Sequence, residues 1–369
     1  GARRAGVAPL GMGVTAGVPV AGGGAGGASG EVVAAASTAT VAAPAVSQAF
    51  KAVAGGISGT VCSLVCSPLD VARTRAMVER TTLAAGAASG GSLNGMYTGV
   101  VAPLRHIYTQ EGVRGWFRGL VPSLVNVPVF WSLYFPMYDA AKQAVRSSGW
   151  DLPETMEHLA GAVSAGAVCD LITNPLWVLR TRLQTHNMYA APGKGVRALG
   201  VLECARGILR HEGALAYYKG LGASLLGLSH VAIQFPLYEH FKKKCGERPG
   251  RRDGPLSTGE IVASSMGSKA IASTLTYPHE VLRARLQHQV TAVGRGRGGS
   301  SPGAAPRPRA YTGITDAVRQ IIREEGIAGM YRGLSLNLVR TLPAVAVTFT
   351  TYEKIVQELP KLGIGAAER

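Results

Sequence analysis

The sequence predicts an all-α membrane protein in which six transmembrane helices form three pseudo-symmetric pairs, joined by short amphipathic helices. Three observations support this prediction: the composition, a set of motifs that recurs three times, and the apolar spans between the motifs. Charged residues make up only 16% of the 369 residues and hydrophobic residues 47%, whereas soluble domains average about 25% charged. The net charge of +16 suits anionic partners such as anionic lipid, nucleic acid or an anionic substrate.

A proline-centred motif occurs three times, and its prolines Pro68, Pro175 and Pro278 are 107 and 103 residues apart. In each copy, arginines stand five and seven residues after the proline. A Glu-Gly pair, an aromatic-basic-glycine triplet and a Tyr-acid pair then follow in the same order in all three segments. Such ordered recurrence indicates internal repeats of about a hundred residues.

Apolar spans lie between these motifs. Residues 52–69 and 119–138 carry no charge, and residues 220–238 contain only His230. Each span is close to the ~20 residues that a helix needs to cross a bilayer. The other three spans each contain one charged residue, namely Asp170, Lys269 or Arg340. We therefore expect helices near residues 46–76, 118–146, 155–184, 219–243, 257–288 and 332–357.

The repeats divide the chain into residues 46–150, 151–250 and 251–358. Residues 1–45 are Gly/Ala-rich and are expected to be a disordered tail, or alternatively a cleaved leader. Residues 291–310 are expected to be a disordered insert, and residues 359–369 a C-terminal tail. The five cysteines show no C-x-x-C pair and no metal-ligand spacing, so we predict no metal site and no cofactor.

Other classes of protein find little support in the sequence. It contains no phosphate loop, no Ser/His/Asp signature and no H-E-x-x-H, so we do not predict an enzyme or any catalytic residue. Binding to nucleic acid would rest on net charge alone and is not expected.

The motif P-x-[DE]-x-x-[RK]-x-[RK], three times at this spacing, resembles the signature of the mitochondrial carrier family over residues 46–358. The resemblance implies a monomer whose six tilted helices surround a cavity open alternately to the cytosol and the matrix. Pro175-Leu176-Trp177 and the run from His230 to Tyr238 are most similar to plant-type NAD carriers, in the branch that carries NAD, pyrimidine nucleotides, FAD and folate.

This resemblance implies an antiporter that exchanges NAD+ for AMP or ADP across the mitochondrial inner membrane. FAD or folate, and pyrimidine nucleotides, remain alternative substrates. A plastid or peroxisomal membrane remains an alternative location.

By the same resemblance, motif charges form a gate on the matrix side. Asp70 would pair with Arg180, and Glu280 with Arg73. Trp177 replaces the acid of the second repeat, so one pair is missing, although a tryptophan can stack on an arginine with ~0.5–2 kcal/mol. The other members are Arg283, opposite that tryptophan, and the glutamine braces Gln184 and Gln287, a pattern that Met77 breaks. Alternatively, these charges only flank the helices at the headgroups.

A second gate is implied on the cytosolic side. Asp139 would pair with Lys242, and Glu353 with Lys142, while Glu239 lacks a basic partner. Each gate would then be short of one ion pair, which lowers the barrier between the two open states.

Charges within the membrane are costly and usually functional. Lys269 is eleven residues before Glu280, and Asp170 is seven before Trp177, so each pair shares a helix face. We therefore expect Lys269 and Asp170 to line the cavity; an internal structural pair is the alternative for Asp170.

Substrate contacts of the family lie mid-way along the even-numbered helices, seven residues past the opening glycine. The matching positions are Asn126, Gly227 and Arg340. Gly227 followed by Leu228 would let a flat base slide against the helix, and Arg340 would bind phosphate. Further candidates are Trp131, Ser229, His230 and Gln234, with a satisfied core histidine as the alternative for His230.

The aromatic-basic-glycine triplets begin the even-numbered helices, whose N-terminal amides favour anions. The resemblance implies that these sites bind cardiolipin; simple helix starts with interfacial aromatics are the alternative. The residues concerned are Arg118, Gly119, Lys219, Gly220, Arg332 and Gly333.

Overall fold

The computed structural model describes residues 48–79, 99–149, 153–186, 188, 199–246, 258–289 and 310–358. The predicted N-terminal tail, the insert at 291–310 apart from Ala310, and the C-terminal tail lie outside these residues. All regular structure in the described part is helical.

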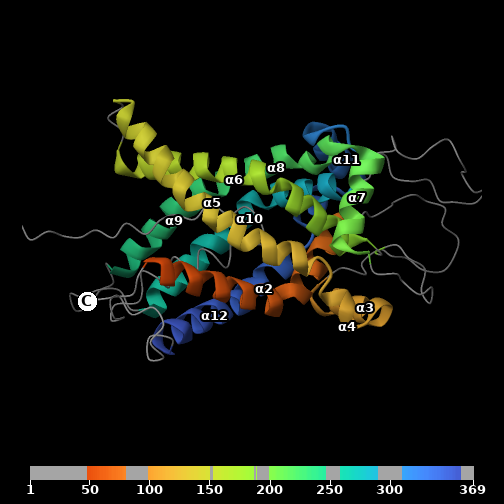
Figure 1. Cartoon of the computed structure of the whole chain (residues 1–369), viewed down its shortest axis with the longest axis horizontal. Coiled ribbons are helices and arrows are strands. Elements are labelled where there is room, and N and C mark those ends of the chain that lie inside the picture. Colours follow the sequence, from red (N-terminus) through yellow and green to blue (C-terminus); the bar gives the residue numbers. More distant parts are fainter. Residues whose placement is uncertain are drawn as a thin grey trace, which may run out of the picture.

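Long helices dominate the described part (Figure 1), and their bounds lie within about three residues of the predicted ones. They are α2 (Gln48–Val78), α5 (Leu120–Ser147), α6 (Glu154–Thr185), α10 (Thr258–His288) and α12 (Leu334–Glu358). The remaining span consists of α8 (Leu221–Gly227) and α9 (Ser229–Gly246), which are separated at Leu228. The sequence did not predict this break.

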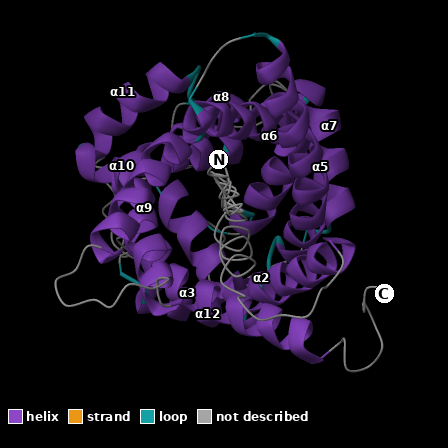
Figure 2. Ribbon diagram, turned by 90° about the vertical axis from the view of Figure 1, so that its left-hand side faces the viewer, coloured by secondary structure: helices purple, strands orange, loops and turns teal. Residues whose placement is uncertain are grey.

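The long helices lie around a common axis (Figure 2). The second helix of each repeat packs against the first helix of the next: α5 against α6, α9 against α10, and α12 against α2. The ring therefore closes on itself, and each repeat contacts both of the others.

Shorter helices connect the two long helices of each repeat. They are α3 (Val101–Glu111), α7 (Val201–Glu212) and α11 (Ile314–Glu325), followed by the single turns α4 (Val113–Trp116), η1 (Ala214–Tyr218) and η3 (Ile327–Tyr331). Each connecting helix ends at the glutamate of a Glu-Gly pair.

The motif prolines lie inside the first helix of each repeat, where they remove a backbone donor. In two repeats, the residue before the proline ties that helix to the turn that precedes the second helix. The Ser67 hydroxyl donates to the carbonyl of Trp116 at 2.8 Å, and the Asn174 amide donates to the carbonyl of Tyr217 at 2.6 Å.

The distribution of polarity is that of a membrane protein. Large apolar side chains such as Val121, Leu275 and Leu342 are about 60% exposed, whereas Asp170 and Arg340 are buried. Four helical segments are long and apolar enough to cross a membrane: Ala54–Val78, Val113–Ser147, Met156–Thr185 and Ala214–Gly246. Helices α10 and α12 have comparable lengths, and α10 is rich in serine and threonine.

Candidate substrate site and gates

Side chains that follow the three motif prolines meet at one level of the bundle. Arg180 of α6 donates to Asp70 of α2 at 2.8 Å between Nη2 and Oδ2. Arg73 of α2 forms an ion pair with Glu280 of α10. Both cross-repeat pairs implied by the sequence are therefore formed in this structure.

Trp177 occupies the place of the missing acid. Its ring centroid lies 4.5 Å from the guanidinium carbon of Arg283 and 5.3 Å from that of Arg180. The tryptophan thus stacks on arginines of its own and of the next repeat, with an attraction of about 0.5–2 kcal/mol each. Cation–π stacking replaces the ion pair at this junction.

Glutamines brace two of the three junctions. The Thr74 hydroxyl donates to Gln184 Oε1 at 2.7 Å, and the Thr181 hydroxyl donates to Gln287 Oε1 at 2.8 Å. The third junction has Ala284 in the place of the threonine and Met77 in the place of the glutamine. Both polar partners have therefore been replaced together, which leaves neither of them unsatisfied.

The space within the gate is small. A cavity of about 60 Å³ is lined by gate residues of α2, α6 and α10, whereas ligand pockets are commonly 300–1,000 Å³. A nucleotide cannot pass through this level, so the structure is closed on the side that the resemblance assigns to the matrix.

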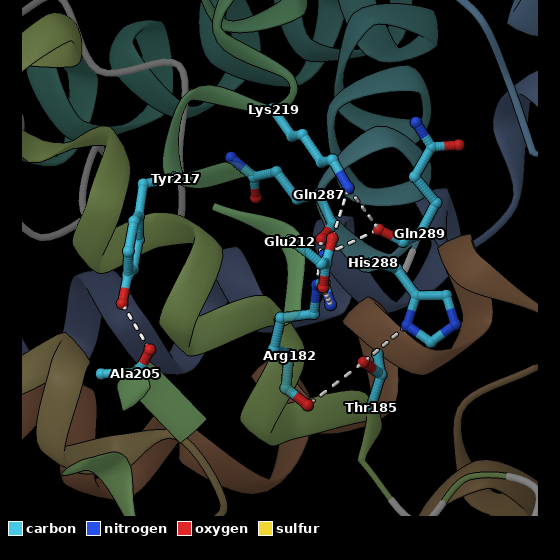
Figure 3. A network of polar contacts seen from close by, with 9 residues as sticks. All are labelled: Arg182, Thr185, Ala205, Glu212, Tyr217, Lys219, Gln287, His288 and Gln289. Atoms are coloured by element: carbon cyan, nitrogen blue, oxygen red, sulfur yellow. Dashed lines mark hydrogen bonds and ion pairs between the residues drawn. The ribbon is translucent and has the colours of Figure 1, made fainter. Parts of the chain in front are cut away.

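A buried polar network below the gate was not predicted from the sequence (Figure 3). Glu212 accepts two bonds from Arg182, at 2.8 and 3.1 Å, and one from Lys219 at 2.5 Å. Arg182 also donates to the backbone carbonyls of Gln287 at 2.6 Å and Gln289 at 2.7 Å. It therefore links its own repeat to the end of the next repeat's first long helix.

The other repeats contain the same network. Arg75 and Arg118 both pair with Glu111, and Arg285 and Arg332 both pair with Glu325. The recurrence of glutamate in each Glu-Gly pair is the sequence signal that could have revealed it.

The residues expected to bind lipid either belong to this network or lie beside it. The basic side chains of the triplets, Arg118, Lys219 and Arg332, pair with the three glutamates. Gly119 and Gly220 have φ of 72° and 78°, a backbone conformation that favours glycine. A Cβ at either position would lie 2.9 Å from the Cγ of a brace glutamine, so close packing also requires glycine.

Several substrate candidates are buried polar groups. Asn126, His230, Asp170 and Arg340 are all at least nine-tenths buried, while Lys269 and Gln234 are half-buried and Ser229 is exposed. The side chain of Trp131 lies outside the described residues. Arg340 Nη1 is 3.1 Å from Asp70 Oδ1, so this substrate candidate contacts the matrix gate. The sequence did not predict that contact.

The interpretation of Gly227 as an open face for a flat base is wrong for this structure. A Cβ on Gly227 would lie 2.6 Å from Nε2 of His279, so an imidazole of α10 fills the space beside the glycine. Leu228 is buried at the break between α8 and α9. His230 Nδ1 lies 3.1 Å from the Thr276 hydroxyl, which agrees with the alternative of a satisfied core histidine.

The cytosolic-gate candidates do not form the implied cross-helix pairs among the described side chains. Lys142 and Lys242 lie over the rings of Tyr138 and Tyr238, at 5.6 and 5.8 Å. Asp139 is exposed, and Glu239 pairs with Lys242 of its own helix at 3.7 Å. The side chain of Glu353 lies outside the described residues. The matrix-side pairs are formed, whereas Asp139 and Lys242, whose side chains are both described, do not pair with each other. This is the arrangement that the resemblance implies for a carrier open to the cytosol.

Known proteins resemble this chain over most of its length. The family model "Mitochondrial carrier protein" matches residues 44–149, 152–248 and 254–362. A nicotinamide adenine dinucleotide transporter 2, mitochondrial, from Arabidopsis thaliana is 37% identical over 84% of this chain and 79% of its own. A nicotinamide adenine dinucleotide transporter 1, chloroplastic, from the same plant is 38% identical over 82% and 90%. Its folate transporter 1, chloroplastic, is 34% identical over 84% and 94%.

Three family matches in succession correspond to the three helix pairs and to the gate residues that each contributes. The chain belongs to the mitochondrial carrier family and is a transmembrane transporter, not an enzyme.

Proposed function

We propose that this protein exchanges NAD+ for AMP or ADP by alternating access. The observation that carries the proposal is Arg340, a buried guanidinium in the second turn of α12 that reaches the matrix gate. Relatives named as NAD transporters at 37 and 38% identity support this choice of substrate.

The charge around Arg340 favours an anion. Four buried arginines lie at or near the gate together with two buried acids and the half-buried Glu280, and Lys269 adds a further positive charge on α10. The cluster therefore has net positive charge when empty, and a dinucleotide with two phosphates would neutralise it. The residues counted are Arg73, Arg180, Arg283, Arg340, Asp70, Asp170 and Glu280.

Uptake into liposomes tests this proposal. Purified carrier is reconstituted in liposomes preloaded with AMP, ADP or buffer, and entry of labelled NAD+ is followed. We expect uptake that requires the internal nucleotide and is abolished by Arg340→Ala. Arg146→Ala is the matched control, because Arg146 is 59% exposed in a surface pair with Glu157 and should leave uptake near wild type.

A second substrate class rests on a specific comparison. The folate transporter at 34% identity makes folate and FAD the first competitors to test, followed by pyrimidine nucleotides. Inhibition of NAD+ uptake by each compound ranks them. If one of them is exchanged while NAD+ is ignored, the substrate proposal is wrong although the carrier assignment stands.

Location and lipid remain part of the proposal. We place the protein in the mitochondrial inner membrane as a monomer, with a plastid membrane as the alternative, because the relatives include mitochondrial and chloroplastic transporters. Cardiolipin would bind at the starts of α5, α8 and α12, where N-terminal amides favour anions; no side chain caps the starts of α5 and α8. Cell fractionation tests the location. Stabilisation by cardiolipin against phosphatidylcholine tests the lipid site.

A further inference from the structure

A second cavity lies beside the connecting helix of the second repeat. It runs between the end of α6 and helix α7, which Figure 1 shows at the same end of the bundle as α3 and α11. Its volume is about 1100 Å³, whereas ligand pockets are commonly 300–1,000 Å³, so a nucleotide would fit. This cavity, which we call the α7 cavity, has no lining residue in common with the small cavity within the gate. It is therefore a separate candidate for a ligand site.

The deep end of the α7 cavity is formed by buried charges that already have partners. Arg182 and Glu212, whose side chains are 9% and 3% exposed, pair with each other at 2.8 Å. Nδ1 of His288 in α10 lies 2.8 Å from the Thr185 hydroxyl of α6, and both residues line the cavity (Figure 3). Two repeats therefore build the site, and the choice of ligand is left to the residues of α7 nearer the opening.

Two arginines of α7 line the cavity without an acidic partner. Arg206 and Arg210 are exposed and lie four residues apart, on one side of the helix. Neither forms an ion pair with another described side chain. Of the two acids in the lining, Glu212 is held by two cations of the network described above, so only Glu203 offsets the two arginines. The lining therefore keeps an excess of positive charge.

A glycine opens the cavity beside these arginines. Gly207 stands five residues before the glutamate of the Glu-Gly pair, where the other repeats have His106 and Gln320. Gly207 lines the cavity, and a Cβ at this position would meet no atom within 4 Å. The second repeat therefore has open space at a position where the other two carry a side chain.

Imidazoles replace acids at two positions around the cavity. His211 stands where α11 has Glu324, and His186 stands where the end of α2 is followed by Glu79. Both histidines line the cavity. An imidazole N–H can donate to an anion in the neutral and in the charged form, whereas a carboxylate would repel it. These exchanges favour an anion in the second repeat.

We propose that the α7 cavity binds a nucleoside diphosphate, at a site separate from the central substrate site. Arg206 and Arg210 would each hold one phosphate through the two parallel bonds that a guanidinium can donate. The apolar side chains of Leu199 and Leu202 line the cavity near the start of α7 and would contact the base. Because the site includes neither Arg340 nor a residue of the gate cavity, it does not depend on the identity of the transported substrate.

Calorimetric titration of ADP tests the site in the purified full-length carrier. The wild type is compared with Arg340→Ala, which disables the proposed central site, and with the double variant Arg206→Ala/Arg210→Ala. We expect the wild type to bind ADP at two sites and Arg340→Ala to keep the site in the α7 cavity. The double variant should weaken that site about a hundredfold, about tenfold for each arginine. A folded Arg340→Ala carrier that binds no ADP would overturn the proposal.

The equivalent arginines of the third repeat provide a matched control. Arg319 and Arg323 occupy the same positions of α11 and are also exposed, but Gln320 and Glu324 stand beside them and bond to each other at 2.9 Å. Arg319→Ala/Arg323→Ala removes the same charge and should leave ADP binding unchanged. An equal loss of affinity in the two double variants would mean attraction by net charge alone and would refute a specific site.

A second variant fills the cavity without changing its charge. Since a Cβ on Gly207 meets no atom within 4 Å, Gly207→Phe should melt close to the wild-type temperature. Its ring would occupy the space beside the arginines, so we expect the affinity of this site for ADP to fall at least about tenfold. Gly207→Ala is the control and should bind ADP as the wild type does. Unchanged affinity in Gly207→Phe would contradict the proposal.

Cardiolipin distinguishes a free nucleotide from the phosphate of a lipid headgroup. The titrations are repeated in detergent micelles with and without added cardiolipin. We expect the same affinity for ADP in both. Competitive loss of ADP binding as cardiolipin is added would overturn the assignment to a soluble nucleotide and identify a lipid site instead.

The outcomes also separate this site from the proposed transport. If ADP binds at one site only, and only Arg206→Ala/Arg210→Ala weakens it, the α7 site is supported and ADP is rejected as a ligand of the central site. If binding is lost only in Arg340→Ala, the α7 site is rejected while the proposed function stands.

Discussion

Gly227→Ala is expected to destabilise the ligand-free carrier. A Cβ at this position would lie 2.6 Å from Nε2 and 2.8 Å from Cδ2 of His279, well inside van der Waals contact. The imidazole has little freedom to move, since His279 is buried and its Nδ1 bonds to the carbonyl of Thr276. Overpacking of this kind costs about 1–3 kcal/mol, so we expect the free energy of unfolding to fall by about that amount.

A thiol-reactive fluorophore provides the assay. Four cysteines are buried in the folded chain, so the rise of the signal with temperature reports unfolding. Gly267→Ala is the matched control within α10, because its Cβ would meet Phe241 at an ordinary 3.5 Å, and alanine favours a helix interior by about 1 kcal/mol. This control should melt at the wild-type temperature or above it.

A double variant separates packing from substrate recognition. If His279 fills the space beside Gly227, then His279→Ala should make Gly227→Ala much less costly, and the two effects should not add. The reasoning fails if Gly227→Ala melts with the wild type and changes only the affinity for nucleotide. That result would restore the interpretation of Gly227 as an open face for a base.

Three further changes have defined outcomes. Glu212→Gln leaves the buried Arg182 and the half-buried Lys219 without their carboxylate and should cost about 3–5 kcal/mol of stability in the same assay. Glu157→Gln, which breaks a surface pair, should cost less than about 1 kcal/mol. Trp177→Leu keeps an apolar side chain but removes the stacking on two arginines, which should weaken the matrix gate. Nucleotide efflux from loaded liposomes without external substrate should therefore rise above wild type, and unchanged efflux would exclude a gate role for Trp177. Burial raises the pKa of the Cys204 thiol to about 11, so about one thiol in a thousand is thiolate at pH 8. Mass spectrometry should find Cys204 alkylated only after unfolding, and much less than the half-buried Cys245 in the folded carrier; rapid alkylation of Cys204 would contradict its burial.

The helices were predictable because their signals are local. The lengths of the charge-free windows indicated the lengths of the helices, and prolines and glycines indicated their ends, so the observed bounds lie within three residues of the predicted ones. The break at Leu228 was not predictable in this way, because Gly227, Leu228 and Ser229 are compatible with a continuous apolar helix. The close approach of His279 at this point comes from another repeat.

The site was predicted correctly where the family resemblance supplied a specific pair of residues. The resemblance implied the pairs of Asp70 with Arg180 and of Arg73 with Glu280, which take the same two motif positions in successive repeats, and both are formed. The contact of Arg340 with Asp70 joins residues at unequal positions, so the repeat pattern contains no trace of it. The resemblance gives Arg340 as a substrate contact but does not say which residues of the gate its side chain reaches.

The three junctions between repeats at the matrix gate differ in chemistry. The first has an ion pair and a glutamine brace, and the second has the Trp177–Arg283 stacking and a brace. The third has the Arg73–Glu280 pair without a brace, but the Glu79 carboxylate there pairs with Arg332 at 3.2 Å.

A junction that loses one contact thus gains another of a different kind. This compensation matters because a ring of three repeats seals only as well as its weakest junction. Each junction therefore needs comparable strength to keep the empty carrier closed. No junction can be so strong that an anion fails to open it. Asp70 meets both requirements at once, because it reaches all three repeats and one of its two arginines, Arg340, is the proposed binding site for that anion.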